Sequence, residues 1–190
     1  ADLLVSGFQG PSTFFTAIYR NDSGVFANLT ILYGLRGSSV AWGDYDNDGR
    51  LDFIVSGTPD YYGYNISQLW RNTGNGFSNV TATVAPGLPG VAGGSVAWGD
   101  YDNDGRLDIL LTGQDMTSSP IAQVWRNTGS GFSNVTSQVA AGLPDRGDGL
   151  AAQLVGELPV LLLGPPPRPR PGDGPQGGDA VLEPHHGLRR

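Results

Sequence analysis

Cysteine and lysine are absent from the 190-residue chain, and histidine occurs only as His185 and His186. Without cysteine the chain has no disulfide framework, no thiolate zinc site and no cysteine nucleophile. Its eleven basic side chains are all arginine and its net charge is −7, which argues against a nucleic-acid-binding surface or a polybasic membrane patch. No apolar run approaches the roughly 18 residues that a membrane span needs.

Glutamate is nearly absent as well, because it occurs only as Glu157 and Glu183. Residues 1–144 therefore contain no Glu, His, Lys or Cys, and general acid–base chemistry there would depend on Asp or Tyr alone. We expect no enzyme active site in this chain, with neither catalytic nor organic cofactor-binding residues. Eight of the eighteen acids lie in two identical stretches, residues 44–52 and 100–108, and the remaining ten nearly balance the eleven arginines, so the net negative charge is local.

The chain is built from internal repeats. Residues 39–52 recur unchanged as residues 95–108, and residues 69–81 return with few changes as residues 124–136. Residues 1–34 match a copy that lacks its first strand and its acidic loop, of which only Asp2 remains. The sequence predicts one partial domain over residues 1–144, with units at about 1–34, 35–90 and 91–144.

The sequence of each full unit predicts four short strands. In the second unit they cover residues 40–42, 51–56, 66–71 and 77–84. Gly, Asn and Pro turns separate these runs, as in antiparallel hairpins. Four strands in about 50 residues are typical of a β-propeller blade, whereas a β-sandwich does not repeat its own sequence at this period. We predict an all-β fold of four-stranded antiparallel propeller blades, arranged as an incomplete ring of about two and a half blades.

The repeat pattern ends after Pro144, and residues 145–190 form a Gly/Pro/Arg-rich tail. This composition predicts a disordered segment or a frame-shifted one, and we assign it no function. An incomplete ring leaves the apolar faces of its outer blades uncovered, to be met by blades missing from this chain or by a partner copy. We expect Leu3 and Val5 at one open face, and the aligned Ile109 and Leu111 at the other.

The two acidic stretches predict two calcium sites. Carboxylates this close repel one another unless a cation lies among them, and oxygen ligands without His or Cys select calcium or magnesium. A glycine at position 6 permits a sharp turn with positive φ, after which a main-chain carbonyl at position 7 and an Asp at position 9 complete the shell. Magnesium tolerates an all-protein cage poorly, so calcium is favoured. The predicted ligands are Asp44, Asp46, Asp48, Arg50 (carbonyl) and Asp52, and Asp100, Asp102, Asp104, Arg106 (carbonyl) and Asp108.

An EF-hand is excluded because it requires a Glu at position 12, where this chain has Val55 or Leu111 within an apolar strand. A solvated Asp/Asn/Gly turn without an ion remains the alternative. Because the two loops lie in different blades, we expect a substitution in one site to leave the other site nearly intact.

The strand–DxDxDGxxD–strand pattern resembles the calcium loop of FG-GAP/VCBS repeats, which form propeller blades in integrin α-subunits and in many secreted proteins. The run AWGDYDNDGRLD and the words Trp/Tyr-Arg-Asn and Phe-x-Asn-Val/Leu-Thr are more similar to the VCBS branch than to integrins. The resemblance covers residues 1–144 and implies six to eight blades, so this chain supplies only part of a ring.

The resemblance implies a non-catalytic, calcium-stabilised region of a secreted or cell-surface protein that serves adhesion or binds a protein or glycan ligand. The alternative is a fragment of a polysaccharide-active enzyme whose active site lies outside this chain. The recurring tryptophans are predicted to pack between blades. Five Asn-x-Ser/Thr triplets are acceptor sites for glycans in such a protein: Asn21, Asn28, Asn65, Asn79 and Asn134. The repeat itself accounts for three of them, Asn28, Asn79 and Asn134, because they hold the same repeat position.

Overall fold

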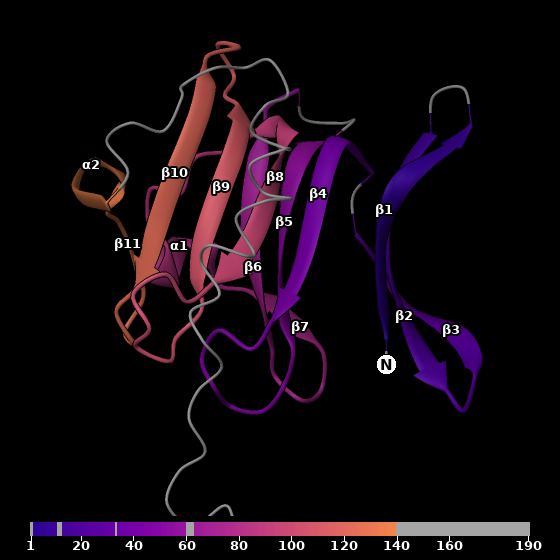
Figure 1. Ribbon diagram of the computed structural model, residues 1–190. Coiled ribbons are helices and arrows are strands. Elements are labelled where there is room, and N and C mark those ends of the chain that lie inside the picture. Colours follow the sequence, from indigo (N-terminus) through magenta and orange to yellow (C-terminus); the bar gives the residue numbers. More distant parts are fainter. Residues whose placement is uncertain (1, 11–12, 33, 60–62, 140–190) are drawn as a thin grey trace, which may run out of the picture.

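The computed structural model describes residues 2–139, apart from residues 11–12, 33 and 60–62 (Figure 1). The predicted tail, residues 145–190, lies outside the described residues. Neither short helix in the described part of the chain is long or apolar enough to cross a membrane. The elements are β1 (Leu3–Gly10), β2 (Thr13–Asp22), β3 (Val25–Leu32), β4 (Leu35–Gly43), β5 (Asp52–Pro59), β6 (Ile66–Asn72), β7 (Phe77–Asn79), α1 (Thr81–Val84), β8 (Ala92–Gly99), β9 (Asp108–Gln114), β10 (Pro120–Asn127), β11 (Phe132–Asn134) and α2 (Thr136–Val139).

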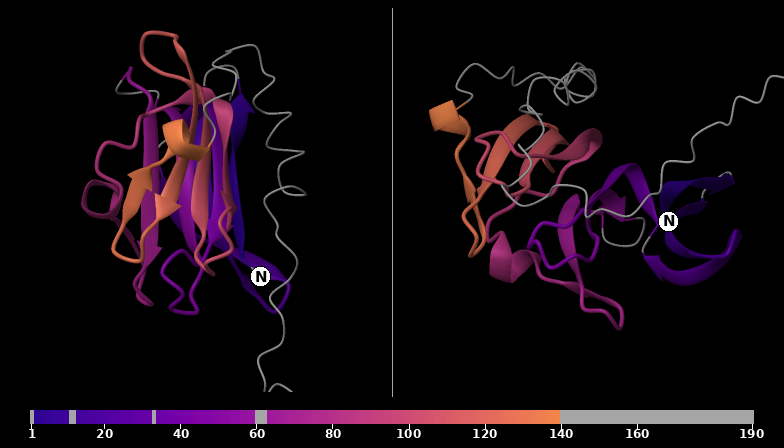
Figure 2. Two further views of the ribbon diagram at one scale, coloured as in Figure 1. Left: turned by 60° about the vertical axis from the view of Figure 1, so that its left-hand side comes forward. Right: turned by 60° about the horizontal axis from the view of Figure 1, so that its bottom comes forward.

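The strands form three antiparallel sheets in which neighbours in sequence are neighbours in space. Sheet 1 has the order β1-β2-β3, sheet 2 the order β4-β5-β6-β7, and sheet 3 the order β8-β9-β10-β11. The right-hand view of Figure 2 shows the sheets side by side in chain order, and β4 contacts both β1 and β8. The predicted all-β fold of propeller blades in an open, incomplete ring is confirmed. Sheet 1 lacks the innermost strand that β4 and β8 supply in the other two sheets.

Strand β5, in the interior of sheet 2, is buried on both faces because a neighbouring sheet packs on each side of it. Phe53 and Val55 point toward sheet 1, where they form a cluster with Ile18. Ile54 lies between them in sequence and points the other way, into a cluster with Leu111 of sheet 3. This two-sided burial explains why the sequence has a continuous apolar run here instead of an alternating one.

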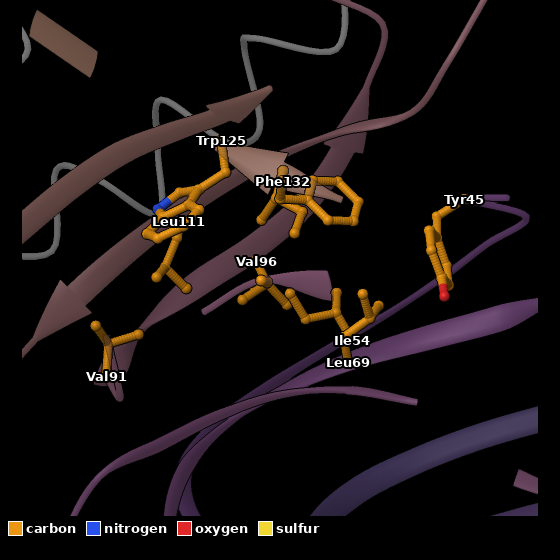
Figure 3. Packing of buried hydrophobic residues seen from close by; sticks show 10 residues of the cluster. Tyr45, Ile54, Leu69, Val91, Val96, Leu111, Trp125 and Phe132 are labelled. Carbon is orange, nitrogen blue, oxygen red and sulfur yellow. The ribbon is translucent and has the colours of Figure 1, made fainter. Parts of the chain in front are cut away.

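Aromatic side chains fill the spaces between neighbouring sheets. Trp42 and Trp70 pack against the cluster between sheets 1 and 2, where Trp70 stacks on Phe53 with ring centroids 5.9 Å apart. Trp125 is 5% exposed and belongs to the cluster between sheets 2 and 3 (Figure 3). Trp98 packs against the same cluster. The predicted packing of these tryptophans between blades is confirmed.

The prediction for the open faces is correct at one end of the array and wrong at the other. Leu3 is 44% exposed and Val5 is half-buried, whereas Ile109 and Leu111 are fully buried between sheets 2 and 3. Aligned residues point in the same direction around the ring, so they face outward at the first sheet and inward at the last. By strand alternation, Leu110 of β9 points the other way from Ile109 and Leu111, and it too is buried, with 5% of its surface exposed.

The predicted fourth strand, residues 77–84, is also shorter than expected, because β7 ends at Asn79 and α1 begins at Thr81. Asn79 Oδ1 accepts hydrogen bonds from the N–H and hydroxyl groups of Thr81, at 3.1 and 2.7 Å. Thr81 Oγ1 in turn accepts the N–H of Leu69 at 2.8 Å, replacing a strand partner. Sheet 3 repeats this arrangement at Asn134 and Thr136. The recurring Asn-x-Thr word thus has a structural role, and glycosylation stays a prediction.

Candidate metal centre

The two acidic stretches form equivalent loops at the same end of the sheets, the lower end in Figure 1. Acidic loop 1, residues 44–52, connects β4 to β5, and acidic loop 2, residues 100–108, connects β8 to β9. The positions where these strands pair are the same in both sheets: Gly43 lies opposite Asp52, and Gly99 opposite Asp108. Each loop therefore begins and ends at the rim of its blade.

The first Asp of each loop holds the turn together. Asp44 accepts the N–H of Asp48 on Oδ1 at 3.0 Å and the N–H of Gly49 on Oδ2 at 2.9 Å. Asp100 makes the same two bonds in loop 2, at 3.0 and 2.9 Å. Gly49 has a φ of +84° and Gly105 a φ of +83°, which confirms the predicted sharp turn.

The turn gathers carboxylate oxygens into a small volume. In loop 1, one oxygen from each of Asp44, Asp46 and Asp48 lies within 4.8 Å of the others. In loop 2 the corresponding trio comes from Asp100, Asp102 and Asp108. The structure thus brings together three of the four predicted carboxylates in each loop, and Asp52 and Asp104 stand outside these trios.

Several of these oxygens are buried without a hydrogen bond. Both carboxylate oxygens of Asp46, and Oδ1 of Asp102, are inaccessible to solvent and have no hydrogen-bond partner in the described part of the chain. Burying an ionised carboxylate in this way is costly unless a cation compensates it. The donor set is all oxygen, which suits a hard ion such as calcium. The residues present therefore fit a calcium ion in each loop.

Arginines that sequence reasoning missed reach the loops from β6 and β10. Arg71 Nε lies 2.6 Å from Asp46 Oδ2, in an ion pair that lacks hydrogen-bond geometry. Arg126 Nε lies 2.7 Å from Asp102 Oδ2 in the same way. The sequence signal for these arginines was the Trp-Arg-Asn motif, which recurs in both full units. In sheet 1, which has no acidic loop, the matching Arg20 pairs with Asp22 instead.

The arginine at position 7 of each loop, predicted to offer its carbonyl, also uses its side chain. Arg50 Nε donates to the carbonyl of Asn72 at 3.0 Å, and its guanidinium pairs with Asp48. Arg106 does the same with Asn127, at 2.9 Å, and with Asp104. Each loop thus carries two arginines as internal counter-ions. A metal ion in the loop would compete with them for the same carboxylates.

The last Asp of each loop is the most deeply buried. Asp52 is 0% exposed and accepts the main-chain N–H groups of Tyr45, at 3.2 Å, and Asn72, at 2.7 Å. Burial nevertheless dominates and raises the pKa of Asp52 to about 6. Asp108 is 2% exposed, and burial likewise raises its pKa to about 6. Asp2, the remnant in the first unit, keeps the same kind of bond, to the N–H of Asn21 at 2.9 Å.

These pKa values predict a pH-dependent calcium affinity. A carboxylate must be ionised to bind the ion, and Asp52 and Asp108, with pKa values of about 6, are mostly ionised at pH 7 and mostly protonated at pH 5. We expect the affinity of each site to fall about tenfold over this range, measured by calorimetry at both pH values. An equal affinity at pH 5 and pH 7 contradicts this expectation. In an Asp52→Asn variant the first site should be weaker but nearly insensitive to pH in this range.

The folding stability of the calcium-free protein should have the opposite pH dependence, falling as the pH rises. Its folded state favours the neutral acids, because their folded pKa of about 6 lies above the unfolded value. The stabilisation this gives is present at about pH 4 and is lost as the pH rises through about 6.

Residues 1–55 and 56–111 match the family model described as FG-GAP-like repeat, which covers more than half of the chain. The chain belongs to the FG-GAP-like repeat family. Each matched FG-GAP-like repeat contains one acidic loop: loop 1 lies in the first and loop 2 in the second. The chain is also similar to integrin alpha pat-2 of Caenorhabditis elegans, with 37% identity over 82 residues. This match covers 42% of the chain and 6% of the relative's length. No solved structure matches the chain.

The boundaries of the FG-GAP-like repeats do not coincide with the sheets. The first repeat contains β1 to β4, acidic loop 1 and the first half of β5, and the second repeat begins within β5. An FG-GAP-like repeat therefore includes the outer strands of one sheet and the inner edge of the next. The acidic loop lies near the end of each matched segment, beside the junction between two sheets.

Proposed function

We propose that this chain is a calcium-stabilised β-propeller region of a secreted or cell-surface protein and that it serves adhesion or ligand binding without catalysis. Two calcium ions bind, one in each acidic loop. The observation that carries the proposal is the buried carboxylate oxygens without hydrogen bonds at Asp46 and Asp102. The ligands of the first ion are Asp44, Asp46, Asp48, Asp52 and the carbonyl of Arg50, and those of the second are Asp100, Asp102, Asp104, Asp108 and the carbonyl of Arg106.

Bound calcium supplies positive charge where the loops hold buried negative charge. The first Asp of each loop shapes the backbone through its two N–H bonds, and the last Asp anchors the loop to the neighbouring strand. The arginines give the loops partial compensation before the ion arrives. They are about half exposed, so their ion pairs are weak and a divalent ion displaces them.

The similarity to an integrin alpha and the membership in the FG-GAP-like repeat family support the adhesion or ligand-binding role and the extracellular or cell-surface location. The ligand is a protein or a glycan. Calcium has a structural part in this role, since it holds the rim of adjoining blades in place. Millimolar calcium outside cells is sufficient for oxygen-ligand sites of the weaker, extracellular kind.

Calcium is expected to raise the melting temperature of the chain by about 10 °C. At ~2 mM calcium and a dissociation constant of ~0.1 mM, each site contributes about 1.8 kcal/mol to the free energy of unfolding. The measurement is thermal unfolding followed by circular dichroism in 2 mM calcium, in 2 mM magnesium and in EDTA. Magnesium should give a much smaller rise, and the double variant Asp48→Ala/Asp104→Ala should give none. A melting temperature that calcium does not change argues against the proposal.

A further inference from the structure

Acidic loop 1 belongs to sheet 2, but its second residue is built into the interface with sheet 3. The Tyr45 side chain is 7% exposed and stacks on Trp98 with ring centroids 6.3 Å apart and planes 7° from parallel. It also contacts Phe132, with centroids 5.7 Å apart (Figure 3). The backbone of loop 1 is therefore fixed against the blade that carries loop 2.

A chain of hydrogen bonds continues from Tyr45 to the last carboxylate of each loop. The N–H of Tyr45 donates to Asp52 Oδ2 in loop 1, at 3.2 Å. The carbonyl of Tyr45 accepts from Asn127 Nδ2 at 2.8 Å, in a buried bond that crosses between the sheets. The N–H of Asn127 donates to Asp108 Oδ1 in loop 2, at 2.7 Å. Asp52 and Asp108, one in each loop, are thus linked through only two residues.

A second contact joins the loops near their tips. Asn47 Nδ2, in loop 1, donates to the carbonyl of Gly105, in loop 2, at 3.3 Å. Gly105 is the turn residue of loop 2, and its N–H is held by Asp100. The expectation of independent sites took the loops to be separate because they lie in different blades. In the structure one hydrogen bond joins the loops directly and a second joins loop 1 to Asn127 of β10, which in turn bonds loop 2.

We infer that the two calcium sites are positively coupled across the blade boundary, with Asn127 as the residue that positions one loop relative to the other. The inference rests on the proposed binding of calcium in each loop. An ion in loop 1 fixes Asp52 and with it the Tyr45 backbone, which holds Asn127 against Asp108 before the second ion arrives. Coupling of this kind between neighbouring sites is reciprocal and is worth about fivefold or more in affinity.

Asn72 is the matched control, because it has the same role in sheet 2 without the bond across sheets. Both side chains donate to a carbonyl of their own loop at 3.2 Å, Asn72 to Leu51 and Asn127 to Leu107. Both also accept a turn N–H on Oδ1 at 2.9 Å, and their main-chain N–H groups bond the last Asp of the loop. Alanine substitution at either position removes the same local bonds, and only Asn127→Ala removes the link to Tyr45.

The experiment is a calcium titration of the full chain by calorimetry, in which loop 2 is disabled by Asp104→Ala and the affinity of loop 1 is measured. We expect Asp104→Ala to weaken loop 1 about fivefold in the unsubstituted background and in the Asn72→Ala background. In the Asn127→Ala background it should change loop 1 less than twofold. Disabling loop 1 by Asp48→Ala should weaken loop 2 by the same factor, because coupling is reciprocal.

A second pair of variants tests the coupling without touching the buried bond. Asn47 and Asn103 hold equivalent positions with φ of +56° and +57°, so glycine preserves the backbone at both. Asn47→Gly should reduce the coupling, and Asn103→Gly should leave it unchanged. If loop 1 binds calcium equally well with loop 2 intact or disabled, the coupling is refuted while calcium binding stands. If neither loop takes up calcium, the proposed function fails first and the inference with it.

Discussion

Replacing Asp48 by alanine is expected to abolish calcium binding at one of the two proposed sites. Asp48 supplies one of the three clustered oxygens of loop 1, and its Oδ1 also accepts the N–H of Arg50. Without this carboxylate, at position 5 of the loop, the ion has too few charged ligands. The remaining ion, in loop 2, should bind about fivefold more weakly because its neighbour no longer holds the boundary between the sheets.

Calcium titration by calorimetry measures both effects in one experiment. The stoichiometry should fall from near two to near one, and the apparent melting temperature in 2 mM calcium should fall by several degrees. Asp22→Ala is the matched control, since it removes the same charge from an exposed hairpin outside both loops. Two full equivalents in the Asp48→Ala variant contradict the ligand assignment.

The second large effect is expected at Gly90, in the connection from sheet 2 to sheet 3. A Cβ atom on Gly90 would lie less than 3.0 Å from the carbonyl group of Asn65 and from the nitrogen of Ile66, all backbone atoms just before or at the start of β6. The equivalent Gly34, between sheets 1 and 2, would meet the carbonyl of Phe14 in the same way. The chain crosses to the next blade in direct contact with the backbone of the previous one, so a side chain there has no room.

Gly90→Ala should therefore lower the free energy of unfolding by about 3 kcal/mol, as overpacking against fixed backbone does. Gly87→Ala, three residues earlier, is the control: its Cβ meets nothing within 4 Å, and its φ of +86° makes alanine cost only about 1 kcal/mol. Urea unfolding of both variants in the presence of calcium distinguishes the steric clash expected at Gly90 from the backbone strain expected at Gly87. If both substitutions lower the free energy of unfolding equally, the close backbone contact at Gly90 is refuted.

The repeat made much of the fold predictable. The period, the Gly and Asn turns and the apolar runs placed the strands, and the burial of Phe53 and Ile54 on opposite faces follows from blades on both sides. The fourth strand was misjudged because Thr81 replaces a strand hydrogen bond with its side chain, a local choice that an apolar pattern does not reveal. Leu111 was misplaced because a repeat tells which residues are equivalent, but equivalent residues point outward at the first sheet and toward the neighbouring sheet at the last.

The site was predictable to the extent that it lies in one stretch of sequence. The spacing of the carboxylates and the positive φ of Gly49 follow from the loop itself. Arg71 and Asn127 were missed because they lie on other strands and meet the loops only through the antiparallel pairing and the packing between sheets. Their common signal was the repeated Trp-Arg-Asn word, which fixed their equivalence without showing what they contact.

The most direct test of calcium binding is the amount of calcium that the full chain retains. After equilibrium dialysis at pH 7 against millimolar calcium in 0.15 M salt, the bound ion is counted by atomic absorption against protein concentration. We predict close to two equivalents per chain, falling to near zero in the Asp48→Ala/Asp104→Ala double variant. A folded chain that retains no calcium above the dialysis buffer contradicts the account.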